Sequence, residues 1–152
     1  MDIAVELQRL IELLRRERVA YALCGGFALA VYGITRATED IDLLVEESSV
    51  AKLREATATL GYRFDGRPML FRGGDVLIYR LHKAEGEDLL VLDLLLVTPA
   101  TQAAWDSRRE VETDFGMVPV VSPGGLIHLK SLRGSGQDQD DIRRLKELPN
   151  ED

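Results

Sequence analysis

The chain has 152 residues and a formal net charge of -7 at pH 7, with 45% hydrophobic and 30% charged residues. This composition is typical of one globular domain that buries a real core. The acidic balance argues against a broad nucleic-acid-binding surface, which needs clustered Lys and Arg, but it leaves room for a local basic patch around an active site. The single cysteine, Cys24, excludes an internal disulfide and suits a reducing compartment.

The N-terminal half of the chain alternates helical and strand patterns. Residues 2–17 carry apolar side chains at helical spacing, which predicts an amphipathic helix. A buried strand over 19–24 includes Cys24, which we expect to be a small buried hydrophobe rather than a reactive thiol. We then expect a turn at Gly25 and Gly26, a short helix over 27–32, a strand from about 39 to 45 and a helix over 50–60.

The C-terminal half begins with a hairpin in which residues 69–71 pair with residues 76–79. We expect Arg72 and Arg80 to be solvated strand charges rather than groups that reach into a cleft. After this hairpin we expect an acidic loop over 84–88, a buried strand over 89–97 and a helix over 99–107. Two strands within 109–121 and a helix from 123 come next. The chain then ends in a joint at 134–136, a last helix and a frayed tail from 149.

Two aspartates lie one residue apart in the second strand. Asp40 and Asp42 project to the same face because side chains alternate along a strand. Carboxylates roughly 7 Å apart repel each other, and they are tolerated if they are solvated, protonated or neutralised by a cation. A hard divalent cation such as Mg²⁺ is the natural partner for ligands that are all oxygen.

A third aspartate, Asp93, lies inside the near-continuous apolar run from Leu89 to Val97. Such a run predicts a strand buried on both faces, where an uncompensated carboxylate costs several kcal/mol or shifts its pKa upward. Asp93 therefore needs a partner. It is either a structural aspartate that is hydrogen-bonded to backbone or a functional carboxylate.

The stretch from Tyr21 to Val45 resembles the nucleotidyltransferase superfamily, which has the DNA polymerase beta-like fold. The family pattern is Gly followed by Gly or Ser, about a dozen residues, and then Asp-x-Asp in a strand. Gly25, Gly26, Asp40 and Asp42 match it. The flanking sequences are most similar to small bacterial members, among them the AbiEii-type toxins of abortive-infection type IV systems.

This resemblance implies an α+β fold, with a mixed β-sheet packed against helices on one side. It implies a single domain over residues 1–152, with an N-terminal helix at 2–17, a catalytic core at about 19–121 and C-terminal helices at about 123–148. The absence of a signal-like N-terminus and of a bilayer-length apolar run leads us to expect a cytoplasmic protein with no membrane partner.

The resemblance also implies an activity. Asp40, Asp42 and Asp93 would hold two Mg²⁺ ions, and the enzyme would transfer NMP from a nucleoside triphosphate to an acceptor hydroxyl with release of pyrophosphate. The acceptor stays open between a tRNA end, a protein hydroxyl and a small molecule such as an aminoglycoside. The proposed activity is compatible with a role in toxin–antitoxin or phage defence. It is also compatible with a homodimer or with binding to a partner protein.

By the same resemblance, five residues would bind the nucleotide: Gly25, Gly26, Arg36, Thr38 and Lys130. Arg36 could equally pair with a nearby carboxylate, and Lys130 could be a snorkelling lysine. The chain departs from the family at Gly26, where many relatives carry Ser, and at Gln137, where Lys is usual. Near Gln137, we expect Asp138 and Asp141 to cap the last helix.

Two other functions compete with transfer. The missing serine, Gln137 and the short C-terminus favour a non-catalytic nucleotide- or partner-binding module on the same fold. A metal-dependent phosphoryl hydrolase would use the same three aspartates. For that reaction the chain lacks a suitable nucleophile or general acid, since His82 and His128 are expected to be structural.

Overall fold

The computed structural model describes residues 1–64, 66–133 and 136–149. The helices are α1 (Ile3–Arg16), α2 (Gly25–Val31), α3 (Val50–Ala58), α4 (Gln102–Asp106), α5 (Pro123–Arg133) and α6 (Gly136–Lys146), with 3-10 turns at Glu47–Ser49 and Arg72–Gly74. The strands are β1 (Tyr21–Cys24), β2 (Asp40–Val45), β3 (Arg63–Phe64), β4 (Met69–Phe71), β5 (Val76–Glu85), β6 (Asp88–Leu96), β7 (Arg109–Thr113) and β8 (Gly116–Val120).

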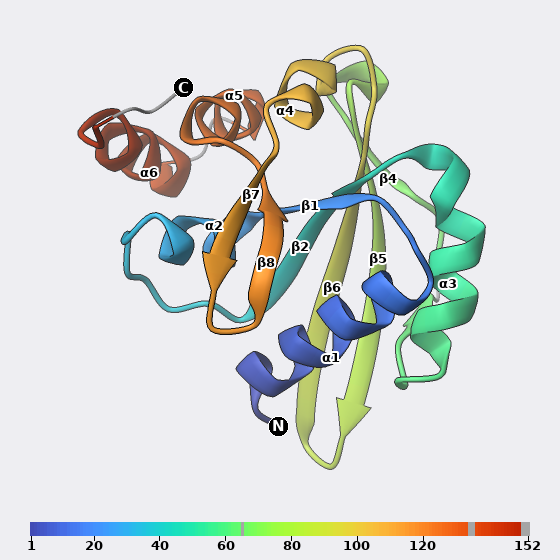
Figure 1. Ribbon diagram of the computed structural model, residues 1–152. Coiled ribbons are helices and arrows are strands. Elements are labelled where there is room, and N and C mark those ends of the chain that lie inside the picture. Colours follow the sequence, from blue (N-terminus) through green and yellow to red (C-terminus); the bar gives the residue numbers. More distant parts are fainter. Residues whose placement is uncertain (65, 134–135, 150–152) are drawn as a thin grey trace.

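The strands form one mixed sheet with the order β3-β5-β6-β2-β1-β8-β7, and β4 also pairs with β5. Strand β2 is antiparallel to β1 and parallel to β6, whereas the β3–β5, β4–β5, β5–β6 and β7–β8 pairs are antiparallel. Figure 1 shows α1 crossing the sheet in front of β5 and β6, with α5 and α6 side by side near the other end. The expected α+β class with a mixed sheet is confirmed.

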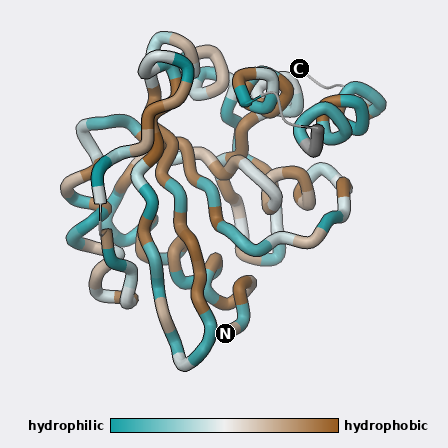
Figure 2. The backbone as a smooth tube through the Cα atoms, turned by 180° about the vertical axis from the view of Figure 1, so that it is seen from behind, coloured by the Kyte–Doolittle hydropathy of each residue, from teal (hydrophilic) through white to brown (hydrophobic). Residues whose placement is uncertain are grey.

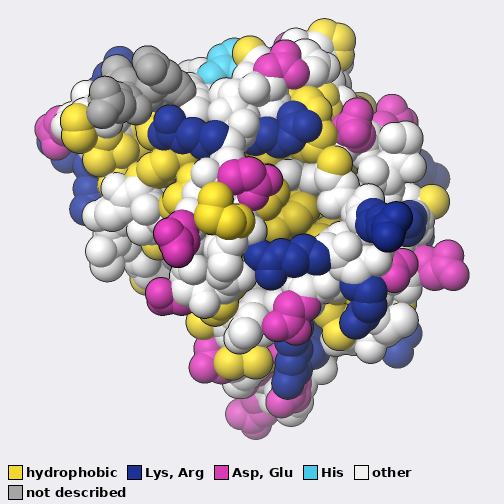
Figure 3. Space-filling view, viewed as in Figure 1, with side chains coloured by type: hydrophobic (Ala, Val, Ile, Leu, Met, Phe, Trp, Pro, Cys, Tyr) yellow, Lys and Arg dark blue, Asp and Glu magenta, His cyan; other side chains and the backbone are white. Residues whose placement is uncertain are grey.

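The core follows from alternation along the strands. Ile41 and Leu43 of β2 and Leu92 and Leu94 of β6 are at most 1% exposed, and the aspartates occupy the intervening positions. Figure 2 shows the central strands as largely hydrophobic, with hydrophilic residues toward their ends and in the loops. On the face seen in Figure 3, the described acidic and basic side chains are interspersed rather than gathered into one basic area. Among the described residues, no helix has the length and apolar character that crossing a bilayer requires.

Three boundaries differ from those expected. Helix α2 begins at Gly25, so the two glycines form its first turn instead of preceding it. The expected acidic loop over 84–88 is a two-residue turn, because β5 and β6 stay paired as far as Glu85 and Asp88, and Gly86 supplies the positive φ that a tight hairpin needs. The last helix already includes Gly136, while the rest of the expected joint and residues 150–152 of the tail lie outside the described residues.

Helix α1 is fixed to the sheet by a buried carboxylate. Glu6 is 3% exposed and accepts hydrogen bonds from the Tyr62 hydroxyl at 3.0 Å and from the Lys83 ammonium at 2.7 Å. Burial alone would raise the pKa of Glu6, but the hydrogen bonds from Lys83 and Tyr62 outweigh it, so the pKa lies below its usual value. Because the folded-state pKa is the lower one, the ionised carboxylate stabilises the fold above the unfolded-state pKa, and this contribution is lost as the pH falls through the folded-state pKa.

We therefore expect the free energy of unfolding to drop more steeply between about pH 6 and pH 3 in the wild type than in Glu6→Gln, which has no carboxylate to protonate. Urea unfolding at several pH values measures this difference. Glu12→Gln, at an exposed position of the same helix, is the control and should follow the wild type. Equal pH slopes in all three proteins would show that the Glu6 cluster contributes nothing through its charge.

Candidate active site

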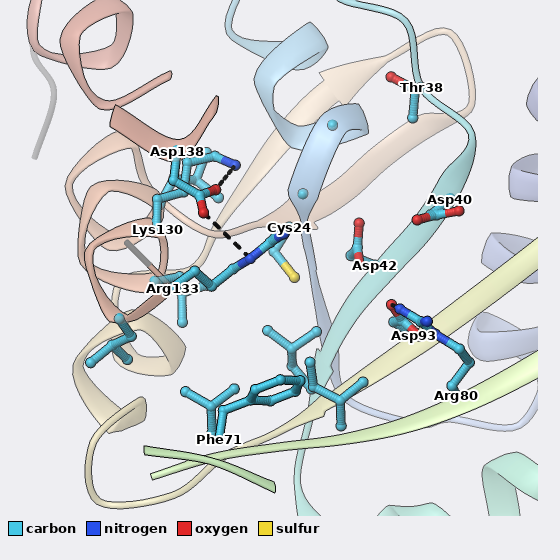
Figure 4. A pocket seen from close by; sticks show the side chains of 18 of the residues that line it. Cys24, Thr38, Asp40, Asp42, Phe71, Arg80, Asp93, Lys130, Arg133 and Asp138 are labelled. Atoms are coloured by element: carbon cyan, nitrogen blue, oxygen red, sulfur yellow. Dashed lines mark hydrogen bonds and ion pairs between the residues drawn. The ribbon is translucent and has the colours of Figure 1, made fainter. Parts of the chain in front are cut away.

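The register of four adjacent strands brings the candidate catalytic residues into one row. Asp42 lies opposite Cys24 of β1 on one side and opposite Asp93 of β6 on the other. Asp93 in turn lies opposite Arg80 of β5. Asp40 is two residues before Asp42 on the same face of β2, as the alternation predicts. The three aspartates that the sequence singled out are therefore neighbours on one face of the sheet (Figure 4).

These residues line a cavity of about 550 Å³. The walls also include all five expected nucleotide-binding residues: Gly25, Gly26, Arg36, Thr38 and Lys130. Cys24 contributes to the same wall, but it is 2% exposed, and burial raises the pKa of its thiol well above the usual value. Cys24 is thus the small buried side chain that the sequence led us to expect.

Arg80 forms a two-point ion pair with Asp93. Its Nε donates to Oδ1 at 2.8 Å and one terminal nitrogen, Nη2, donates to Oδ2 at 2.9 Å, while Asp93 is only 4% exposed. Bidentate pairs of this kind are among the stronger hydrogen bonds in proteins. The sequence led us to expect a solvated Arg80, which is wrong. The signal that could have found it is the tight turn at Gly86, which fixes Arg80 opposite Asp93.

The other two carboxylates, Asp40 and Asp42, have raised pKa values. Burial, followed by the charges of Asp93 and Asp40, raises the pKa of Asp42 to about 7. Burial and then the charge of Asp93 also raise the pKa of Asp40. Ionising both side chains beside Asp93 is unfavourable without further positive charge, which is the condition that a bound cation relieves.

The donor set fits a hard divalent cation such as Mg²⁺, because Asp40, Asp42 and Asp93 offer only carboxylate oxygens and Arg80 pairs with only one of the three. The described residues nevertheless contain no group of three acidic, His or Cys side chains already converged on one point. Both oxygens of Asp93 face Arg80. Asp93 can therefore join a metal site only if it shares or releases at least one of these hydrogen bonds.

Gly25 has to be a glycine for two reasons. Its φ is +67°, in the left-handed region that other residues rarely adopt, and a Cβ there would lie 2.1 Å from Oδ2 of Asp42. Gly26 is also closely packed, since its Cβ would lie 2.8 Å from the hydroxyl oxygen of Thr38. The Thr38 side chain thus occupies the space into which a serine side chain at position 26 would project.

Lys130 and Arg36 line the cavity, but both are ion-paired with α6. The Lys130 ammonium lies 3.4 Å from Oδ1 of Asp138 and 3.1 Å from Oδ2 of Asp141, and Arg36 pairs with the same oxygen of Asp141. Asp138 lies in the first turn of α6 as expected, yet both aspartates are at most 1% exposed. They join the helix to α5 and to the loop before β2, a role that we did not expect. The side chain of Gln137 lies outside the described residues.

Gly25→Ala should unfold at clearly lower denaturant concentration than the wild type and should lose Mg²⁺-dependent nucleotide binding, because the added Cβ displaces Asp42. Gly33→Ala is the matched control, since Gly33 has a φ of +85° and nothing within 4 Å of its Cβ position. It should incur only the backbone cost of about 1 kcal/mol and keep the binding. Equal losses in the two variants would remove the special role of Gly25.

Arg80→Gln leaves Asp93 without its cation. We expect the free energy of unfolding to fall by about 1–3 kcal/mol, less than for a fully buried pair, because the Arg80 side chain is 42% exposed. Added Mg²⁺ should then stabilise the variant more than the wild type, since the ion replaces the lost positive charge. Urea unfolding with and without Mg²⁺ measures both effects, and Arg63→Gln, at an exposed position of β3, is the control. A Mg²⁺ effect that is smaller in Arg80→Gln than in the wild type would contradict this account.

Comparison with other proteins identifies the family and the fold of the chain. The model of the family described as "Nucleotidyl transferase AbiEii toxin, Type IV TA system" matches residues 10–133. The chain belongs to this family and is therefore a nucleotidyltransferase. No curated protein matches the chain.

Solved structures of nucleotidyltransferases share its fold. The lincomycin-bound lincosamide antibiotic adenylyltransferase LnuA is 19% identical, with 95% of this chain and 96% of that chain covered and a TM-score of 0.63. The antibiotic-resistance factor ANT(2'')-Ia in its solution structure is 17% identical, with 95% and 84% covered and a TM-score of 0.64. A crystal structure of ANT(2'')-Ia with adenylyl-2''-tobramycin is 16% identical, with 93% and 95% covered and a TM-score of 0.56.

Proposed function

We propose that this nucleotidyltransferase is a Mg²⁺-dependent enzyme that transfers NMP from a nucleoside triphosphate to an acceptor hydroxyl and releases pyrophosphate. One observation carries the proposal. Asp40, Asp42 and Asp93 lie side by side at the wall of a cavity that also contains the glycine-rich start of α2. The raised pKa values of Asp40 and Asp42 are consistent with a site that is completed by cations.

Asp40, Asp42 and Asp93 would hold two Mg²⁺ ions, which supply charge neutralisation at the attacking and leaving oxygens. The chain itself positions the substrates. Gly25 and Gly26 form the first turn of α2 and line the cavity, so their backbone N–H groups would donate to phosphate oxygens.

Three further side chains would complete the nucleotide site. The Thr38 hydroxyl lies next to Gly26 and donates to the carbonyl of Arg36 at 3.4 Å, and a phosphate oxygen would replace that long hydrogen bond. Arg36 and Lys130 add positive charge to the same wall while they are held by Asp141. Their ion pairs imply that they orient the loop and α5 as well as attract the nucleotide.

The acceptor and the biological role follow from the relatives as proposals. ANT(2'')-Ia in complex with adenylyl-2''-tobramycin and lincomycin-bound LnuA favour a small molecule of the antibiotic type as acceptor. The family description favours a role as the toxin of a type IV toxin–antitoxin system, with a partner protein. A tRNA end and a protein hydroxyl are the other acceptors to be tested, and we place the enzyme in the cytoplasm.

The proposal predicts Mg²⁺-dependent thermal stabilisation by at least one of the four ribonucleoside triphosphates. At about 100 times the dissociation constant, the ligand should add roughly 2.7 kcal/mol, or a few degrees in Tm. With the α-labelled form of that triphosphate, label should pass to an acceptor in cell extract. Asp42→Asn and Asp93→Asn should abolish this transfer, whereas Asp114→Asn, at an exposed turn position far along the chain, should not affect it.

Full transfer by Asp42→Asn would refute the mechanism. Mg²⁺-dependent nucleotide binding with no transfer to any acceptor would instead establish the non-catalytic binding module. That alternative has some support in the structure, because Arg36 and Lys130 are already neutralised by carboxylates.

A further inference from the structure

The row of site residues gives the reaction a direction across the sheet. Gly25 follows β1, Asp42 lies on β2, Asp93 on β6 and Arg80 on β5, and these strands are neighbours in this order. If the phosphates lie at the glycines, the leaving oxygen is on the β1 side of the carboxylates. Attacking and leaving groups in phosphoryl transfer lie roughly in line. The acceptor hydroxyl therefore approaches from the opposite side, over β6, β5 and β4.

That side of the cavity is apolar. The sheet contributes Met69 and Phe71 of β4, Ile78 of β5 and Leu95 of β6, and α5 faces them with Leu126 and Leu129. Phe71 is 48% exposed although it lines the cavity wall, so its ring can still be covered by a ligand. Figure 4 shows Phe71 among aliphatic side chains on the side of Asp42 and Asp93 away from Thr38.

Two cationic side chains, Arg72 and Arg80, lie on the β4–β5 side of the cavity, whereas Figure 4 shows Arg133 beside Cys24 of β1. Arg72 donates from Nε to the carbonyl of Leu132 at 2.6 Å, and Arg80 and Arg133 line the same cavity. Among the described lining residues, the carboxylates are Glu39, the three candidate metal ligands and Asp138. Asp138 is ion-paired with Lys130 and Arg133, and Asp93 with Arg80, so neither offers a free anionic contact to an incoming cation.

We infer that the acceptor is a small hydroxyl compound with an apolar or aromatic body that is neutral or anionic, and that it binds against Phe71. A polycationic acceptor would be repelled by Arg72, whose guanidinium is held by a backbone carbonyl rather than by a carboxylate, and it would have to cover apolar side chains with ammonium groups. This inference rests on the proposed transfer reaction and adds the chemical class of its acceptor.

The test measures probe binding to protein saturated with Mg²⁺ and an α,β-methylene nucleoside triphosphate, which cannot react. The probes are 3-hydroxy-2-naphthoate, which is an aromatic anion with a hydroxyl group, the polycation tobramycin, and the trinucleotide CCA as an RNA end. We expect 3-hydroxy-2-naphthoate to bind, tobramycin not to bind, and CCA to bind more weakly than the naphthoate.

Two adjacent residues of β4 supply the matched variants. Phe71→Ala should weaken binding of 3-hydroxy-2-naphthoate about tenfold or more. Leu70→Ala should change it less than twofold, because Leu70 is 64% exposed and does not line the cavity. The Mg²⁺-dependent thermal shift caused by the nucleotide should be the same in both variants, since the acceptor wall lies on the far side of the carboxylates.

Three results would overturn the inference. The first is a wild type that does not bind the naphthoate, and the second is tobramycin or CCA binding that Phe71→Ala leaves unchanged. The third is a Phe71→Ala variant in which the thermal shift caused by the nucleotide falls as much as the binding of the naphthoate does. That result would show that the Phe71 wall binds the base of the nucleotide instead of the acceptor. Failure of the nucleotide itself to bind is visible in the saturation step, and it would instead contradict the proposed function.

Discussion

Repulsion between carboxylates held in register is the constraint on which the rest of this structure depends. Strand pairing sets Asp42 directly beside Asp93, and the alternation along β2 adds Asp40 to the same face. Neighbouring strands lie about 4.8 Å apart, so these charges cannot separate without breaking the sheet. The chain meets the constraint partly with Arg80 and partly by raising the pKa of Asp42 and Asp40. The negative charge that Arg80 leaves uncompensated is what the proposed cations would neutralise.

The charged side chains in the wall formed by α5, α6 and the loop before β2 are also paired, as buried charges in proteins usually are. Lys130 contacts Asp138 and Asp141, and Arg36 shares Asp141, so α5, α6 and the loop before β2 are joined by one network. Asp138 and Asp141 each have two cationic partners, so the loss of one cation leaves each carboxylate with the other. The cations that we propose to attract a nucleotide also join these elements, so a substitution of Lys130 or Arg36 is expected to change stability as well as binding.

The sequence predicted the parts of the site that depend on local pattern. Alternation placed Asp40 and Asp42 on one face, and the apolar run around Asp93 indicated a buried carboxylate that needs a partner. The sequence did not predict that Arg80 is the partner of Asp93, because this pairing depends on a two-residue turn where a longer acidic loop was expected. Nor could it predict that Asp141 would reach Arg36 or that Thr38 would fill the space beside Gly26, since both contacts depend on how separate elements pack.

The division of the cavity explains why a shared fold does not fix the acceptor. The glycines and the carboxylates come from α2, β2 and β6, which hold the Gly-Gly pair, the Asp-x-Asp pair and Asp93. The opposite wall is made by hydrophobic side chains of β4, β5, β6 and α5, such as Phe71, Ile78 and Leu129, which form no ion pair with the aspartates. Nucleotide chemistry is therefore tied to the centre of the sheet. The choice of acceptor depends on side chains such as Phe71 and Arg72 near its edge, and these have to be interpreted from this chain itself rather than from structures that are less than 20% identical.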